Sequence, residues 1–188
     1  MSKKLVVVYH SGYGHTAKQA QAVAAGAGAT LIAIDAEGNL SDADWASLDA
    51  ADAIIMGSPT YMGSVSWQFK KFADVSSRVW FTQKWKNKIA AGFTNSASMN
   101  GDKLSTLHYM FTLSMQHGMV WVGTGMMPAN SKEAQRDDVN YLGTYAGAIA
   151  TSPSNASADE MLSGDLETAR LFGQRVAEIT RQFVAGRG

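Results

Sequence analysis

The sequence predicts an α/β fold in which a doubly wound, five-stranded parallel sheet in the order 2-1-3-4-5 carries helices on both faces. Three observations support this prediction. Apolar runs alternate with helix-like runs along most of the 188 residues. The apolar runs are nearly continuous, as in strands that are buried on both faces. The first of them leads directly into a loop rich in glycine and hydroxyl groups and then into a helix. A chain of this length is expected to form one domain, residues 1–188.

Each expected element follows from its local pattern. Val-rich and Ile-rich runs predict strands, Ser41 is a suitable N-cap ahead of acidic residues, and the last segment has an apolar stripe at helical spacing. The expected strands are residues 4–9, 30–35, 53–58, 89–94 and 119–122, and the expected helices are residues 17–26, 41–48, 65–79, 102–117 and 158–184. Residues 123–157 form a long irregular segment, which in a compact domain is usually functional.

The composition excludes several classes of protein. Lys plus Arg equals Asp plus Glu, whereas a nucleic-acid-binding protein has a basic excess. There is no cysteine, so redox chemistry requires a bound cofactor. The apolar run behind the basic start is too short for a signal peptide, and no stretch is long enough for a membrane span. We therefore expect a cytoplasmic protein with no nucleic-acid partner. His10 and His15 match no zinc-ligand spacing, so no metal site is expected.

The loop after the first strand is a candidate anion site. Its sequence is Ser11-Gly12-Tyr13-Gly14-His15-Thr16. The free N–H groups of the following helical turn and the helix dipole favour negative charge there, and the hydroxyls of Ser11 and Thr16 can donate hydrogen bonds. The loop contains no lysine or arginine, so it suits a single phosphate that is held by neutral donors.

A triphosphate-binding Walker A loop is excluded because no Gly-Lys-Ser/Thr follows. Three other interpretations of this loop remain open. The spacing Gly12-x-Gly14-x-x-Ala17, with Asp35 about 20 residues further on, matches a dinucleotide-binding fingerprint. The two hydroxyl groups favour a monophosphate site instead. A strand-to-helix turn without any ligand is the remaining alternative.

Two further loops are expected to meet the first one, because the loops after strands 1, 3 and 4 converge at the switch point of such a sheet. They are Pro59-Thr60-Tyr61-Met62-Gly63, which can expose backbone groups to a ring edge, and Thr94-Asn95-Ser96-Ala97-Ser98, which offers polar donors. Ordinary turn residues and a helix cap are the alternatives. Trp80 could stack on a heterocycle or be an ordinary aromatic. His117 could donate to a bound carbonyl or simply complement a helix dipole.

These motifs together resemble a known family. They are Tyr9-His10-Ser11-x-Tyr13-Gly14-His15, Gly57-Ser58-Pro59-Thr60-x-x-Gly63-x-x-Ser66-x-Gln68-x-x-x-Phe72-x-Asp74, Trp80, His117-Gly118-Met119-Val120 and Gly143-Thr144-Tyr145-Ala146-Gly147. They resemble the WrbA-type NAD(P)H:quinone oxidoreductases, which are FMN proteins with a flavodoxin-like fold. The resemblance implies the FMN phosphate at Ser11 to Thr16 and flavin contacts from Pro59 to Gly63, from Trp80 and from Thr94 to Ser98. It also implies that His117 lies beside the face where nicotinamide and quinone bind in turn.

The expected function is therefore FMN-dependent two-electron transfer from NAD(P)H to quinones by a ping-pong mechanism, in a homo-oligomer that is a dimer or a tetramer. Residues 123–157 are expected to help form the site, from the same or a neighbouring subunit. Three departures from the family pattern leave the nicotinamide contact and the subunit arrangement open. They are Tyr61 in place of an arginine, Ala97-Ser98-Met99-Asn100 in place of a glycine-rich run, and a short segment after strand 2. The alternative is an FMN electron carrier without this turnover.

Overall fold

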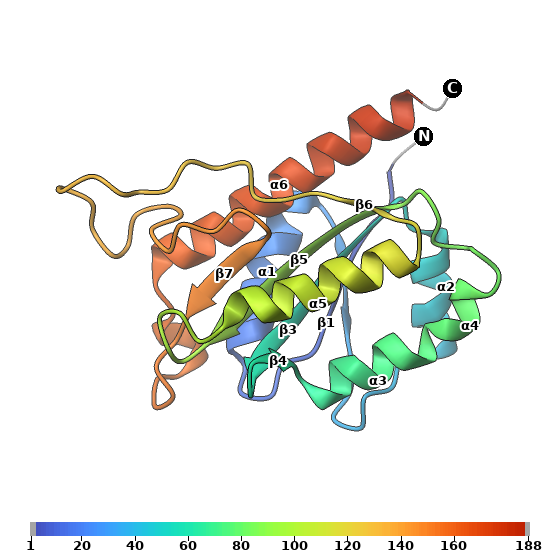
Figure 1. Ribbon diagram of the computed structural model, residues 1–188, viewed down its shortest axis with the longest axis horizontal. Coiled ribbons are helices and arrows are strands. Elements are labelled where there is room, and N and C mark those ends of the chain that lie inside the picture. The colour runs from blue at the N-terminus through green and yellow to red at the C-terminus, as the bar shows by residue number, and fades with distance from the viewer. Residues whose placement is uncertain (1–2, 187–188) are drawn as a thin grey trace.

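The computed structural model describes residues 3–186, and Figure 1 shows the arrangement of their helices and strands. The elements are β1 (Leu5–Tyr9), α1 (His15–Ala27), β2 (Thr30–Ala33), α2 (Asp42–Ala50), β3 (Ala53–Tyr61), β4 (Ser64–Val65), α3 (Trp67–Val75), α4 (Ser77–Trp80), β5 (Ile89–Ser96), α5 (Lys103–Gln116), β6 (Val120–Trp121), β7 (Ala148–Thr151), the 3₁₀ helix η1 (Ala158–Glu160) and α6 (Ser163–Ala185).

The sheet has the strand order β2-β1-β3-β5-β6. All of these neighbours pair in parallel. Because β5 is the fourth of these strands along the chain and β6 the fifth, this is the predicted order 2-1-3-4-5, and the predicted fold class is confirmed. The switch point of this order lies between β1 and β3, and ligands bind at the carboxyl ends of the strands there.

The edge strand next to β5 is divided into two pieces, β6 and β7. β6 pairs with Ile89 and Ala90 at the start of β5, and β7 pairs with residues 93–96 at its end. The chain between them leaves the sheet and forms the long loop that extends from one end of the molecule in Figure 1. The expectation that residues 123–157 are irregular throughout is therefore wrong at β7. Four residues give too short a pattern to predict a strand, and their partner strand lies more than 50 residues earlier.

Three other predicted segments also differ from the structure. β3 continues to Tyr61 because β4 pairs with its end in an antiparallel hairpin, and Met62 and Gly63, both with positive φ, form the two-residue turn. The predicted helix at residues 65–79 is two helices, α3 and α4, separated at Ser76. β5 likewise includes Asn95 and Ser96, which we expected in a loop. Parts of the predicted binding loops are therefore strand residues with backbone partners.

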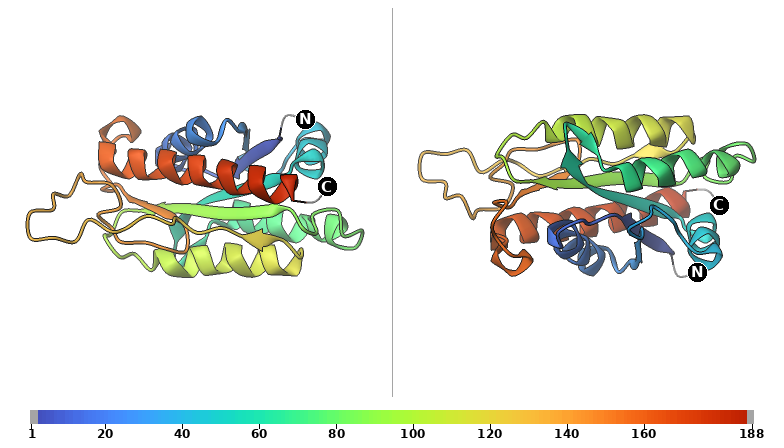
Figure 2. Two further views of the ribbon diagram at one scale, coloured as in Figure 1. Left: turned by 90° about the horizontal axis from the view of Figure 1, so that it is seen from above. Right: turned by 90° about the horizontal axis from the view of Figure 1, so that it is seen from below.

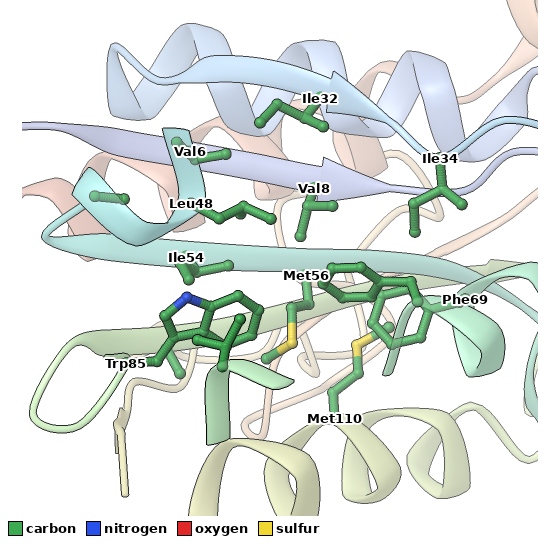
Figure 3. Close-up of a cluster of buried hydrophobic side chains, with 14 of the residues drawn as sticks. Val6, Val8, Ile32, Ile34, Leu48, Ile54, Met56, Phe69, Trp85 and Met110 are labelled. Atoms are coloured by element: carbon green, nitrogen blue, oxygen red, sulfur yellow. The ribbon is translucent and has the colours of Figure 1, made fainter. Parts of the chain in front are cut away.

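Helices cover both faces of the sheet, as Figure 2 shows. α1 and α6 pack on one face over a core that includes Val7, Ile55 and Phe172. α2, α3 and α5 contribute to the core on the other face, around Phe69 and Trp85 (Figure 3). Among the described helices, none has the combination of length and apolar character that a membrane span requires.

Candidate functional site

A pocket of about 370 Å³ lies at the carboxyl ends of β1, β3, β5 and β7. It is lined by Tyr13, His15, Thr16, Pro59, Thr60, Tyr61, Asn95, Ser96, Ala97, Ser152 and Ser154. The three predicted loops therefore meet, as expected from the topology. The lining contains no lysine, arginine, aspartate or glutamate, so the pocket offers hydrogen bonds and aromatic surface rather than charge.

The first loop presents unpaired backbone donors to this pocket. Gly14 has a φ of 93° and is the N-cap of α1, a conformation that glycine adopts without steric cost. Ser11 Oγ accepts hydrogen bonds from the amides of Gly14 and Ala17, both at 3.1 Å. Within residues 3–186, the amides of Tyr13, His15 and Thr16 have no hydrogen-bond partner. These donors and the Thr16 hydroxyl, at the positive end of a helix dipole, are suited to an anion.

The segment after β7 covers this loop. The His15 ring donates from Nε2 to the carbonyl oxygen of Ala156 at 2.9 Å, which requires the proton to be on Nε2. The Ser152 hydroxyl donates to Asn95 Oδ1 at 3.0 Å. These contacts bring Ser152 and Ser154 into the lining. The long segment was expected at the site, but its sequence does not distinguish these two serines, because many serines in the segment have the same local pattern.

Two tyrosines form one wall of the pocket. The rings of Tyr13 and Tyr61 meet edge to face with centroids 6.2 Å apart. A Cβ atom at Gly12 would lie 2.5 Å from the Tyr61 hydroxyl oxygen, so the glycine lets the Tyr61 side chain lie directly against this loop. Burial, and secondarily the neighbouring Tyr13, raises the pKa of the Tyr61 phenol above its ordinary value of 10.0. Tyr61 therefore stays neutral and joins the loop after β1 to the end of β3.

A chain of buried hydroxyl groups supports the pocket from below. Thr60 Oγ1 lies 2.8 Å from Thr94 Oγ1 and 2.8 Å from Thr106 Oγ1. Thr94 and Thr106 are fully buried, so each hydroxyl is satisfied by its neighbour. Thr94 consequently fixes Thr60 in place and does not line the pocket itself.

The remaining predicted loop residues surround the pocket without lining it. Met62 and Gly63 form the hairpin turn, and the Met62 side chain is fully exposed. Ser98 lies beyond the lining and accepts a hydrogen bond from the Ser96 hydroxyl through its carbonyl oxygen, at 3.1 Å. Ser11, Gly12 and Gly14 shape the turn ahead of α1.

The structure does not bring His117 to this pocket. His117 follows α5, whose first residue lies near the pocket and whose length is about 21 Å at 1.5 Å per residue. The imidazole is buried, its Nε2 is 2.9 Å from Ser76 Oγ, and its ring packs on Trp85 with centroids 4.5 Å apart. Within this chain His117 therefore does not lie at the pocket, because α5 runs antiparallel to the strands and its last residues reach the opposite end of the sheet.

Trp80 also lies outside the pocket lining. It ends α4, is partly exposed and packs edge to face on Phe81, with centroids 5.0 Å apart. In Figure 1 this helix is at the end of the molecule away from β7. Within this chain, Trp80 therefore cannot stack on a ligand in the pocket.

Asp35 does not act as the acid of a dinucleotide fingerprint. Its Oδ1 accepts hydrogen bonds from the amides of Glu37 at 3.0 Å and Asn39 at 2.6 Å. The amide of Asn39 is the largest of the contacts that lower the pKa of Asp35 below its ordinary value. Because this carboxylate closes its own turn, the monophosphate interpretation of the loop after β1 is the better one.

An FMN molecule fits the chemistry of these residues. Its phosphate needs several donors around one anion, and the free amides at the N-terminus of α1 supply them. Its flat, largely uncharged ring suits a lining of tyrosine, proline, small residues and amide groups, without a fixed charge.

Comparisons with known proteins agree with this assignment. Residues 43–134 match the family model described as NADPH-dependent FMN reductase. A protein of Pseudomonas aeruginosa named Flavodoxin FldP is 56% identical over 97% of this chain and 99% of its own length. A protein of Archaeoglobus fulgidus named NAD(P)H dehydrogenase (quinone) is 32% identical over 95% of this chain and 98% of its own length.

A solved structure gives the same result. The crystal structure of a flavodoxin, WrbA-like protein from Agrobacterium tumefaciens is 57% identical, has a TM-score of 0.81 and covers 96% of this chain and 99% of that one. Identity at this level over nearly the whole length indicates the same family as well as the same fold. The chain belongs to the WrbA-type family of flavodoxin-like FMN proteins.

Proposed function

We propose that this protein catalyses two-electron transfer from NAD(P)H to quinones with FMN as its cofactor. The observation that carries the proposal is the uncharged lining of the pocket, bounded by two tyrosines on one side and by small polar residues on the other. Nicotinamide and quinone rings are both flat, and neither a reduced nicotinamide nor a quinone carries a charge on its ring. A lining of this kind suits both rings in turn.

In this proposal, different residues bind different parts of the cofactor. The amides of Tyr13, His15 and Thr16 and the Thr16 hydroxyl bind the phosphate. Residues 59–61 and 95–97 bind the ring edge and its faces, and Ser152 and Ser154 close the side opposite Tyr61. When it is bound, FMN supplies the hydride and electron chemistry that no side chain of this chain can perform. His117 has no direct part, because it is buried at the other end of α5.

The test is anaerobic stopped-flow reduction of the holoprotein by NADH and by NADPH, followed at the flavin absorbance band. We expect rapid bleaching by at least one nucleotide and rapid recovery when a quinone is added. Steady-state rates should give parallel lines in double-reciprocal plots, because the oxidised nucleotide leaves before the quinone enters the same pocket. Negligible bleaching by both nucleotides would contradict the proposal.

A second candidate is an electron carrier that docks on protein partners. Large apolar side chains are exposed at the pocket: the lining residue Tyr13 is 81% exposed, and Met62, which follows the lining residue Tyr61, is fully exposed. The relative named Flavodoxin FldP also favours this candidate. A carrier would be reduced slowly by free nucleotides and rapidly by a reductase protein, so the same stopped-flow experiment with a flavodoxin reductase added separates the two functions.

A homo-oligomer goes with the proposed function. Trp80, which is remote from the pocket in its own chain, can contribute to a pocket only in a neighbouring copy, and a dimer or tetramer would provide one. Light scattering of the holoprotein measures the mass directly, and a monomer at micromolar concentration would exclude this arrangement. The reaction requires NAD(P)H, so a cytoplasmic location is also part of the proposal.

A further inference from the structure

Lys88 and Lys103 are both buried, and each ammonium group is surrounded by backbone carbonyl oxygens. Lys103 is 1% exposed. Its Nζ donates to the carbonyl oxygens of Ser98 at 2.6 Å, Met99 at 3.0 Å and Asn100 at 3.4 Å, and to Thr151 Oγ1 at 3.1 Å. Lys88 is 8% exposed. Its Nζ donates to the carbonyl oxygens of Leu48 at 3.3 Å, Asp49 at 2.7 Å and Ala51. The two lysines thus make similar contacts in different parts of the fold.

Lys103 occupies a position that is electrostatically unfavourable for a cation. It is the first residue of α5, where the helix dipole disfavours positive charge. Burial lowers its pKa to about 8, although the charge of Asp165 acts in the opposite direction. Two residues with positive φ, Gly101 and Asp102, come directly before it. A sequence that breaks local preferences in this way usually does so at a functional or strained site.

The contacts of Lys103 lead to both polar sides of the pocket. The carbonyl oxygen of Ser98, which accepts from Lys103, also accepts from the hydroxyl of Ser96, a lining residue. Thr151, the other partner, directly precedes the lining residue Ser152. Lys103 does not line the pocket itself. It shares the Ser98 carbonyl oxygen with the lining residue Ser96, and it bonds to Thr151, the residue before the lining residue Ser152.

A second interaction fixes the same strand end. The amide of Thr151 donates to Asp165 Oδ2 at 2.9 Å, and Asp165, which is 2% exposed, forms a two-pronged ion pair with Arg136 at 2.9 and 2.8 Å. Arg136 belongs to the long loop between β6 and β7. The end of β7 is thus held by α5 on one side and by α6 and the long loop on the other.

We propose that Lys103 is a positioning residue for FMN, whose ammonium group holds the loop after β5 and the end of β7 together so that Ser96 and Ser152 face the cofactor. The proposal rests on the FMN site of the proposed function but not on turnover of NAD(P)H or quinone. Lys88 is the matched control, because it binds carbonyl oxygens of residues 48–51 near the amino end of β3 and does not line the pocket.

The experiment compares the parent holoprotein with Lys103→Met and Lys88→Met. Each holoprotein is diluted in series, and free FMN is measured by its fluorescence, which gives the dissociation constant. We expect both variants to unfold at lower urea concentration, because each leaves buried carbonyls without a donor. Only Lys103→Met should raise the FMN dissociation constant, by about tenfold. An unchanged constant in Lys103→Met, or an equal rise in Lys88→Met, would overturn the proposal.

Two further variants keep the test decisive if Lys103→Met does not fold. Thr151→Val removes only the hydroxyl acceptor and should raise the constant about threefold, whereas Thr151→Ser should bind FMN like the parent. The visible circular dichroism of bound FMN should change in Thr151→Val and not in Lys88→Met, because it reports the ring's surroundings. A Thr151→Val variant with the parent's constant and spectrum would contradict the proposal. A parent that binds FMN but is not reduced by NAD(P)H would overturn the proposed function alone.

Discussion

At the scale of single residues, two hydroxyl groups of one loop have different tasks. Ser11 and Thr16 were both expected to bind a phosphate. In the structure Ser11 Oγ accepts from two backbone amides, as an N-cap side chain does, while Thr16 lines the pocket. The distinction follows from direction: the side chain of Ser11 turns back towards the helix that it precedes, and that of Thr16 faces the cavity.

This distinction predicts opposite outcomes for two alanine variants. Thr16→Ala should weaken FMN binding by about 1–2 kcal/mol, the value of a hydrogen bond to a charged group, with little change in the stability of the apoprotein. Ser11→Ala should lower the free energy of unfolding of the apoprotein by about 1 kcal/mol, the value of a helix cap. FMN titration and urea unfolding measure the two quantities. If Thr16→Ala bound FMN like the parent, the phosphate would have to be placed elsewhere.

At the scale of elements, α1 and α6 pack unusually closely. A Cβ atom at Gly26 of α1 would overlap the carbonyl oxygen of Arg170, and one at Gly173 of α6 would overlap that of Val23. The two glycines therefore allow the backbones of the helices to touch. This contact fixes α1, whose N-terminus forms the anion site, relative to α6, which follows the segment that covers it.

Gly173→Ala tests this contact. In an open helix, alanine would be more stable than glycine by about 0.5–1 kcal/mol. Here overlap should force the helices apart, and we expect a net loss of about 2 kcal/mol in the free energy of unfolding. Gly186→Ala is the control, since the nearest atom to a Cβ there is 3.7 Å away. Urea unfolding of both variants gives the answer, and a Gly173→Ala variant as stable as the parent would show that the close approach is not required.

At the scale of the whole molecule, the two ends of the sheet have different tasks. The carboxyl ends of the strands carry the pocket, and the opposite end is held by buried polar contacts, among them Lys88 with carbonyl oxygens and His117 with Ser76. Since the Ser76 hydroxyl donates to the carbonyl oxygen of Ala73, the His117 ring is the donor to Ser76. His117 thus joins the end of α5 to the junction of α3 and α4.

The burial of His117 predicts a dependence of stability on pH. Burial lowers its pKa below the ordinary value of 6.5, so below that pH the unfolded chain takes up a proton that the folded chain does not. The free energy of unfolding should therefore be highest above pH 6.5 and fall as the pH decreases below it. His10 acts in the same direction.

His117→Asn separates the contribution of His117 from that of His10. Urea unfolding at one pH above 6.5 and one below it, with FMN held constant, should show a smaller loss on acidification in this variant than in the parent. His108→Asn, at an exposed position of α5, is the control and should keep the parent's loss. An unchanged loss in His117→Asn would mean that other groups cause the acid sensitivity.

The sequence by itself determined the order of strands and helices, the parallel sheet and the meeting of the three loops at one edge of the sheet. These features depend on local patterns: apolar runs of one length, glycine and hydroxyl spacing, and the rule that parallel strands end at one edge. Most of the predicted residues in these three loops line the pocket for that reason.

Only the tertiary structure decided which distant residues complete the site. The contact of His15 with Ala156 joins residues 141 positions apart, and that of Lys103 with Thr151 joins residues 48 positions apart. Similar local sequence surrounds many serines and lysines of this chain, so no pattern distinguishes the ones that meet. The place of His117 in the chain's own fold could not be read from the sequence for the same reason: it depends on the direction of α5, which is set by packing across the whole sheet.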